Sequence, residues 1–373
     1  MAEFVNNATN SSNGTLPVWT PDPNPHKFDI LDAALIAYMI VGFIEAALNL
    51  PMAIAILKQE AMRELKEYWM ISAQAICDSA DGIGFFAAGV DRLITIFANQ
   101  KTMPVTPMHC MFKLYNNLWS WTGASSPIML LVTSIDRIIA CSVPLTYQRF
   151  QTRRYIGIMI GGALFISVAF SYIPAYIYPF ANTGKVSTAI CYSEMAYGNT
   201  FSDYQHNLKS VCAFASVLLF PVVVYLFYKK MVVAVATGVD STALEYRKKL
   251  AKKMTISMGI SSLATLIFTV ILTTVGSWAM TSVAKDSILY EGLLLVWPLQ
   301  KLDAIANPFL YIGKHEEMRR SMRALFKCQR LPPDVSMWCP KKGKMAWESS
   351  ATGTNQHRLS QHRLSQQRSS VNI

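Results

Sequence analysis

The sequence predicts an all-α integral membrane protein, in which a bundle of seven transmembrane helices precedes a short amphipathic helix. Three observations support this prediction: the apolar composition, the grouping of apolar residues in long blocks, and the position of basic residues beside those blocks. Of the 373 residues, 52% are hydrophobic and only 15% are charged, which is too apolar for an ordinary soluble protein. The net charge of +11 comes from residues that flank the blocks instead of forming one basic face, so nucleic acid is not an expected partner.

Residues 1–28 form the first segment, which is polar and rich in proline. They lack the basic and apolar regions of a signal peptide, but they carry three N-glycosylation sequons close together. The acceptor residues are Asn7, Asn10 and Asn13. Because glycosylation takes place in the lumen of the secretory pathway, the sequons predict an extracellular, glycosylated N-terminus.

Residues 29–312 contain seven apolar blocks, each long enough to cross a bilayer as a helix that satisfies its own backbone hydrogen bonds. The blocks cover residues 30–57, 68–97, 111–141, 155–180, 208–233, 254–283 and 288–312. An odd number of spans places the two termini on opposite sides of the membrane. With the N-terminus outside, the inner segments and their flanks hold 26 of the 34 Lys and Arg residues, as the positive-inside rule requires. The expected location is the plasma membrane, with the C-terminus in the cytoplasm.

Residues 313–328 predict a short amphipathic helix on the inner membrane surface. Met318, Met322 and Leu325 recur there at helical spacing, with basic residues between them, which is typical of a helix that contacts lipid. Cys328 at its end is a candidate palmitoylation site; an unmodified cysteine is the alternative.

Residues 329–373 are polar and predict a disordered cytoplasmic tail. The repeat near its end places three serines after basic residues. These candidate phosphorylation sites are Ser360, Ser365 and Ser369. A solvated low-complexity tail without modification is the alternative.

Two motifs at the inner ends of predicted spans resemble those of rhodopsin-like (class A) G-protein-coupled receptors. The stretch SIDRIIACSVPLTY resembles the family signature D-R-Y…P-L-x-Y through Asp136, Arg137, Pro144, Leu145 and Tyr147. The stretch NPFLY in the seventh span resembles the motif N-P-x-x-Y through Asn307, Pro308 and Tyr311. The resemblance covers residues 29–328. It implies an extracellular ligand, a heterotrimeric G protein, and arrestin and a receptor kinase that act at the tail.

The chain also departs from the family pattern. Ile138 replaces the tyrosine of the first motif, and the sixth span lacks its central Trp and Pro. These departures indicate a divergent lineage. The general pattern is similar to that of nematode serpentine chemoreceptors, without a motif that assigns a subfamily.

The resemblance assigns roles to two further pairs of residues. It implies that Asp136 holds Arg137 in the inactive receptor, and that Arg137 meets the G protein once an inner helix swings outward. It also implies a disulfide between Cys110 and Cys191, although Cys110 lies two residues farther from Arg137 than is usual.

Polar residues within the predicted spans match the polar core of the family at Asn49, Asp78, Ser126 and Asp303. A carboxylate deep in a helix bundle needs a cation, a proton or several hydrogen-bond donors. The two carboxylates, Asp78 and Asp303, therefore favour either a sodium ion held with Ser126 or one protonated acid. A neutral hydrogen-bonded network is the alternative.

The ligand cavity is expected around Asp81, Trp119 and Lys301. Trp119 stands where amine receptors of the family carry an acid, so a peptide or a small organic molecule is the expected ligand and a biogenic amine is not. Lys301 has the spacing of the retinal-linking lysine of opsins, but the family geometry also brings it close to Asp81 as a structural ion pair. The seventh span would then carry three layers on one helix: Lys301 at the cavity, Asp303 at the ion pocket, and Asn307 to Tyr311 at the switch.

Three functions remain open on the sequence. A ligand-gated receptor explains both motifs, whereas an opsin-like light receptor rests on Lys301 alone. A transporter would use the charges within the membrane as its pathway, but the two halves of the chain show no internal repeat. No nucleophile–base pair or metal-ligand cluster indicates an enzyme. No cofactor is expected, apart from the sodium ion or, in the opsin alternative, retinal.

Overall fold

The structure is a computed structural model that describes residues 28–182, 186–236, 259–260, 263–272, 274–276, 279 and 296–327. Seven predicted modification sites lie outside these residues: Asn7, Asn10, Asn13, Cys328, Ser360, Ser365 and Ser369. The predicted disordered tail lies outside them as well.

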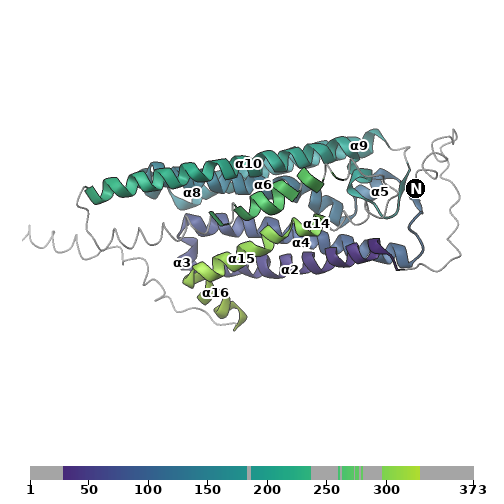
Figure 1. The fold of residues 1–373 in the computed structure, drawn as a ribbon, viewed down its shortest axis with the longest axis horizontal. Coiled ribbons are helices and arrows are strands. Elements are labelled where there is room, and N and C mark those ends of the chain that lie inside the picture. The colour runs from purple at the N-terminus through teal and green to yellow at the C-terminus, as the bar shows by residue number, and fades with distance from the viewer. Residues whose placement is uncertain are drawn as a thin grey trace, which may run out of the picture. The chain divides into compact units, whose positions relative to one another are not determined.

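The described chain is mostly helical (Figure 1). Its first half contains α2 (Ile30–Lys58), α3 (Glu60–Arg63), α4 (Lys66–Phe97), α5 (Pro107–Met111), α6 (Leu114–Ser142), α7 (Pro144–Arg149) and α8 (Thr152–Ile156). The π-helix η1 (Gly157–Gly161) continues α8 into α9 (Gly162–Ala181), and α10 (Ser193–Ala236) follows. The later elements are the π-helix η2 (Thr265–Ile271), α14 (Val296–Leu299), α15 (Leu302–Lys314) and α16 (Glu316–Phe326).

Four helical segments of the described chain are long and apolar enough to cross a membrane: Ile30–Lys58, Leu114–Ser142, Thr152–Ala181 and Thr200–Lys229. They agree with the first, third, fourth and fifth predicted spans to within a few residues, except that α10 begins well before residue 208. Helix α4 is as long, with 32 residues, but Asp78 and Asp81 interrupt its apolar run. The predicted sixth span is described only in part.

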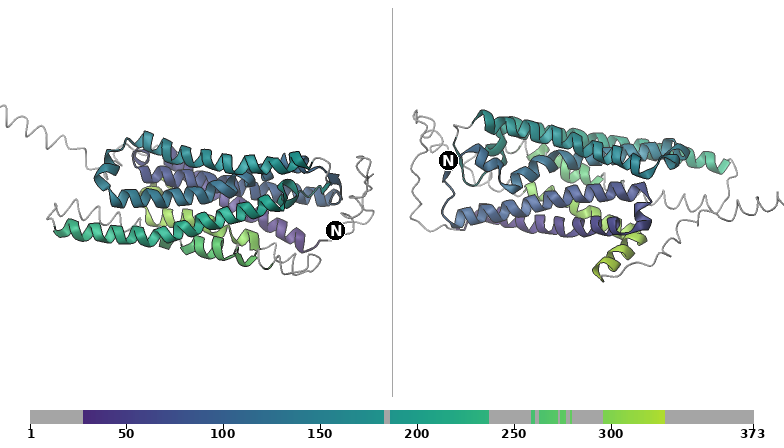
Figure 2. Two further views of the ribbon diagram at one scale, coloured as in Figure 1. Left: turned by 90° about the horizontal axis from the view of Figure 1, so that it is seen from above. Right: turned by 180° about the vertical axis from the view of Figure 1, so that it is seen from behind.

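The long helices pack along one another through small residues and apolar clusters. Helix α2 lies against α4, α4 against α6, and α6 against both α9 and α10 (Figures 1 and 2). Gly82 of α4 permits the first of these contacts, because a Cβ atom there would come within 2.8 Å of the backbone of Ala46. Helix α16 buries Met318 and Met322 in a cluster formed with α2, α3 and α4.

Local chemistry explains where several helices begin or bend. Asp29 caps α2: its Oδ1 accepts a hydrogen bond from the Asp32 amide at 3.1 Å, while Asp32 Oδ2 accepts from the Asp29 amide at 2.9 Å. Near its start, α10 bends at Gly198, whose φ of 78° suits only glycine without strain. The predicted seventh span is not one continuous helix, because the chain turns at Gln300 and Lys301, between α14 and α15.

The predicted disulfide between Cys110 and Cys191 is confirmed, with the two Cα atoms 5.1 Å apart. Cys110 lies on the separate short helix α5, before α6 begins, which explains its extra two residues of distance from Arg137. Strands β1 (Pro104–Val105) and β2 (Ser187–Thr188) pair antiparallel beside the bridge. Arg92 donates hydrogen bonds to the carbonyl oxygens of Ile190 at 3.1 Å and Cys191 at 3.2 Å. The bridge therefore belongs to a well-connected end of the helix bundle.

Replacing both Cys110 and Cys191 by serine is expected to lower the free energy of unfolding by about 2–5 kcal/mol, because the bridge closes a long loop of the unfolded chain. The midpoint of thermal unfolding of the purified protein measures the effect. Cys141→Ser is the matched control, since Cys141 is a free cysteine of intermediate exposure. An unchanged midpoint in the double variant would show that the surrounding hydrogen bonds suffice without the bridge.

Candidate functional site

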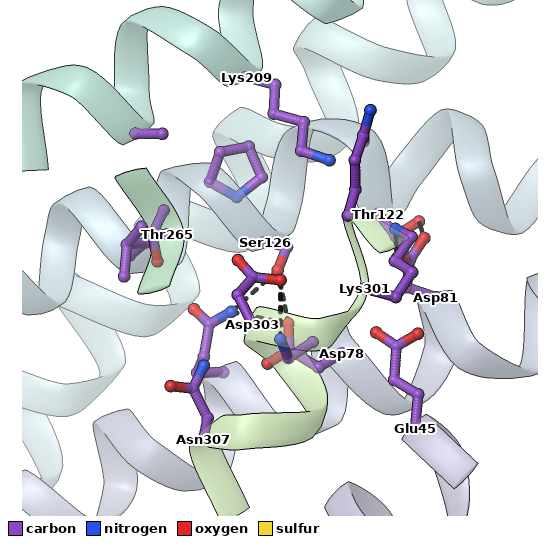
Figure 3. Close-up of a pocket in the computed structure, with 17 residues that line it drawn as sticks. Glu45, Asp78, Asp81, Thr122, Ser126, Lys209, Thr265, Lys301, Asp303 and Asn307 are labelled. Atoms are coloured by element: carbon purple, nitrogen blue, oxygen red, sulfur yellow. Dashed lines mark hydrogen bonds and ion pairs between the residues drawn. The ribbon is translucent and has the colours of Figure 1, made fainter. Parts of the chain in front are cut away.

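A polar cavity lies between the long helices (Figure 3). Its ionisable side chains come from four helices and from the turn before α15: Glu45, Asp78, Asp81, Lys209, Lys301 and Asp303. Pro127, Leu130 and Ala213 supply apolar parts of the wall. The cavity therefore combines several charges with apolar wall, the mixture that is typical of sites for small organic molecules.

Lys301 forms an ion pair with Asp81 on one wall of the cavity. Its Nζ contacts Asp81 Oδ2, and Thr122 Oγ1 donates to Asp81 Oδ1 at 2.8 Å. The ammonium also lies 4.6 Å from the centre of the Phe85 ring, a favourable cation–π distance. Lys301 precedes the first turn of α15, so the break in the predicted seventh span lies next to this pair.

Asp78 belongs to a second polar group of the cavity. Its Oδ1 accepts hydrogen bonds from Ser126 Oγ at 2.6 Å and from Gln74 Nε2 at 2.8 Å. Asp303 lines the same cavity, and its Oδ1 accepts from the amide of Ala304 at 2.7 Å. The structure thus brings together Asp78, Ser126 and Asp303. In the described part of the chain, no three His, Cys, Asp or Glu side chains are arranged to hold a metal ion.

Asn49 has a different place from the other three polar-core residues. It is fully buried, and its Nδ2 donates to the carbonyl oxygens of Glu45 at 3.0 Å and Ala304 at 3.1 Å. Asn49 therefore ties α2 to the backbone of α15 and is not among the described residues that line the cavity.

Arg137 is held by two acids at the end of the bundle opposite the disulfide. Its NH2 group lies 2.6 Å from Asp136 Oδ2, and its NH1 group lies 3.5 Å from Glu67 Oε1. Asp136 is fully buried and accepts from the hydroxyl groups of Tyr147 at 3.1 Å and Tyr155 at 2.8 Å. The network joins the start of α4 to the end of α6 and to the helices that follow it.

Lys66 lies next to this network in a cage of aromatic rings. Its Nζ contacts the Tyr147 carbonyl oxygen and lies 4.3 Å from the Tyr147 ring centre and 5.1 Å from that of Tyr155. Burial lowers the pKa of Lys66, against the opposing effect of the neighbouring Glu67 and Asp136. Burial, and next to it the charge of Glu67, raises the pKa of Tyr147 well above its usual range, so its hydroxyl stays a hydrogen-bond donor to Asp136.

The other residues of the two motifs are spread over several places. Pro144 is the first residue of α7, which also contains Leu145. Asn307 lines the cavity beside Asp303. Pro308 is buried within α15. Tyr311 packs against the apolar cluster of α2 and α16, and the centre of its ring lies 6.2 Å from that of His315.

Trp119 is not among the described residues that line the cavity, in contrast to its predicted place there. Its ring packs edge-on against Phe85, with centroids 5.0 Å apart, and against Tyr115 at 5.8 Å. The guanidinium of Arg92 lies 5.3 Å from its centre. Trp119 therefore belongs to the aromatic packing between the cavity and the disulfide.

Sequence reasoning missed three charged residues of these sites, Glu45, Lys209 and Glu67. Glu45 and Lys209 each lie inside an apolar block, which is the signal that drew attention to Lys301 and would have identified them as well. Glu67 directly precedes the second apolar block, where a charge is ordinary, and only its contact with Arg137 distinguishes it.

Two comparisons with known proteins bear on this arrangement. The family model described as serpentine type seven-transmembrane G-protein-coupled chemoreceptor Srsx matches residues 39–326. Melanopsin-A of Gadus morhua is 24% identical over 255 residues, which are 65% of this chain and 44% of that protein. The chain thus spans less than half the length of this relative.

Proposed function

The chain belongs to the serpentine chemoreceptor family Srsx of G-protein-coupled receptors, and from this premise we propose that it binds an extracellular ligand in the polar cavity and activates a heterotrimeric G protein. Members of such a family are multi-pass membrane proteins, and the apolar helices agree with that. The proposed arrangement is a plasma-membrane protein with seven spans, an extracellular glycosylated N-terminus, and a cytoplasmic tail that serves arrestin and a receptor kinase. Helix α16 would lie on the inner membrane surface.

The observation that carries the proposal is the network around Arg137. Two carboxylates hold one arginine at the end of the third predicted span, and two tyrosine hydroxyls donate to one of these carboxylates, Asp136. A charged network that can be broken and remade provides two alternative packings, as a rigid-body switch requires. The G protein would bind at this end once Arg137 is released.

The polar cavity supports the other half of the proposal. It lies between helices whose movement would repack the bundle, so a ligand that binds one packing better than the other shifts the equilibrium between them. Asp78, Ser126 and Asp303 would hold a sodium ion or a proton beneath the ligand, because two carboxylates in one cavity favour one added positive charge.

The test is a second-messenger assay on cells that express the chain, screened against pooled organic acids, neutral metabolites, amines and peptides. A response that depends on the receptor supports the proposal. A vesicle assay for substrate flux is the counter-test, because flux without any G-protein response would make the chain a transporter.

An opsin-like receptor with retinal at Lys301 is the second candidate. The match to Melanopsin-A and the position of Lys301 in the cavity favour it. The ion pair with Asp81 counts against it, because the Lys301 ammonium already has a partner within the protein. The same screen therefore includes retinal with light. This candidate requires a visible absorbance band that disappears in Lys301→Ala.

A further inference from the structure

Lys209 is a second lysine in the polar cavity, and its surroundings differ from those of Lys301. It comes from α10, on the side opposite Glu45, and its side chain points into the cavity (Figure 3). Among the described residues, no carboxylate forms an ion pair with Lys209 and no acceptor takes a hydrogen bond from it. An ammonium group inside a helix bundle without a partner is costly and is retained where something else supplies the negative charge.

The described acids of the cavity contact groups other than Lys209. Asp81 is paired with Lys301 and accepts from Thr122. Asp78 accepts from Ser126 and Gln74, and Asp303 accepts from the Ala304 amide. These partners come from α4, α6 and the start of α15.

Glu45 does not balance Lys209 either. It is fully buried, and neither carboxyl oxygen has a hydrogen-bond partner among the described residues. A carboxyl group enclosed in this way, without donors or a paired cation, is stable as the neutral, protonated acid. Lys301 and Asp81 contact each other, and Asp78 and Asp303 accept hydrogen bonds from other groups, so Lys209 is the charged group of the cavity that no described acid contacts.

We propose that Lys209 binds the carboxylate of the ligand, so that the receptor recognises a small organic acid with one free carboxylate and an apolar body. This inference rests on the proposed function, since it assigns the ligand of the same cavity. Pro127, Leu130 and Ala213 would contact the apolar body. A carboxylate fits better than a phosphate, because one ammonium balances one negative charge and the nearby acids repel a second.

Thermal unfolding of the purified receptor tests the inference without any assay of signalling. The probes are butyrate, hexanoate, phenylacetate and benzoate, each compared with its amide and with the amine of the same carbon skeleton. The acids are expected to raise the midpoint of unfolding in a saturable way, because a ligand that binds only the folded state stabilises it. The amides and amines are expected to have no such effect.

Variants of Lys209 then locate the binding site. Lys209→Gln is expected to weaken the apparent affinity for the active acids roughly 10- to 100-fold, the range expected for one charge-assisted contact, whereas Lys209→Arg retains part of it. Glu45→Gln distinguishes the opposite assignment. If amines stabilise the receptor and only Glu45→Gln abolishes that effect, the ligand is a cation and the inference is wrong.

A measurement without ligand separates a binding role from a structural one. If the role of Lys209 is to bind a ligand anion, Lys209→Met removes an unpaired charge. The midpoint of thermal unfolding without ligand is then equal to or above that of the wild type. A lower midpoint would show that Lys209 has a partner within the protein, which overturns the inference. So would the absence of any effect of the four acids.

The outcomes also separate this inference from the proposed function. Acids that stabilise the protein through Lys209 but evoke no second messenger would support the site and contradict the receptor. A second-messenger response to neutral molecules or amines alone would support the receptor and contradict the assignment of Lys209.

Discussion

Replacing Arg137 by alanine is expected to abolish activation of the G protein, while the receptor still folds and reaches the cell surface. The fold should tolerate the change because Asp136 keeps two hydrogen-bond donors, the hydroxyl groups of Tyr147 and Tyr155. Signalling should be lost, because the Arg137 guanidinium is the group that would leave this network and contact the G protein. The loss of one charge-assisted contact sets the minimum effect, a roughly 10- to 100-fold weaker response.

Glu67 offers a way to measure this effect before a ligand is known. Its carboxylate lies 3.5 Å from Arg137 and comes from the start of α4. Glu67→Gln therefore removes this ion pair with Arg137 while keeping the size of the side chain. We expect a higher basal rate of nucleotide exchange on purified G protein. Adding Arg137→Ala in the same chain should return that rate to the level without receptor.

Arg320→Ala is the matched control for the lost charge. Arg320 pairs with Glu316 on the surface of α16, with about half of each side chain exposed, and exposed pairs of this kind contribute little. Surface expression, measured with an extracellular tag, must be similar in all variants. Full coupling by Arg137→Ala at normal expression would exclude the proposed switch.

The sequence predicted the helices better than it predicted their interruptions. The apolar runs mark the long helices, because a membrane span needs a minimum number of apolar residues whatever its neighbours are. The turn at Gln300 and Lys301 and the π-helix at Gly157–Gly161 leave no such mark. Both depend on how neighbouring helices pack, and a run of apolar residues is compatible with a straight or an interrupted helix.

The candidate site was predictable where a residue type is costly in a membrane and not where packing decides its direction. Asp78, Asp81 and Lys301 are conspicuous in apolar blocks, and the structure places all three in one cavity. Trp119 is suited both to a cavity wall and to a packed core, and only the neighbouring Phe85 and Tyr115 rings decide between them. Position in the sequence gives the depth of a side chain along a helix but not the partner it contacts.

The pair formed by Lys301 and Asp81 should show a large coupling energy in a double-mutant cycle. Removing one member of a buried ion pair leaves the other charge without a partner and costs about 3–5 kcal/mol, whereas replacing both members by neutral residues is often nearly neutral. Both side chains are little exposed, at 12% and 11%. We therefore expect Asp81→Asn and Lys301→Met each to lower the midpoint of thermal unfolding, and the double variant to recover most of the loss.

The two single changes should differ in size, because Glu45 lines the same cavity. In Asp81→Asn, Glu45 can ionise and pair with Lys301, and Thr122 can still donate to the amide oxygen of the new side chain. In Lys301→Met, Asp81 keeps Thr122 alone as a partner among the described residues. Lys301→Met is thus expected to be the more damaging change, and combining Asp81→Asn with Glu45→Gln should remove the difference.

The pair of Lys113 and Asp91 is a control of the same chemistry at the surface. Lys113 Nζ lies 2.9 Å from Asp91 Oδ1, and the two side chains are 28% and 33% exposed, so the coupling energy of this pair should stay below about 1 kcal/mol.

Additive effects of the changes at Lys301 and Asp81 would mean that the two buried residues are not energetically coupled. If the double variant folds and still signals, neither residue is needed to detect the ligand, and the retinal candidate is excluded. If it folds but no longer signals, the pair acts in ligand recognition beyond its structural role.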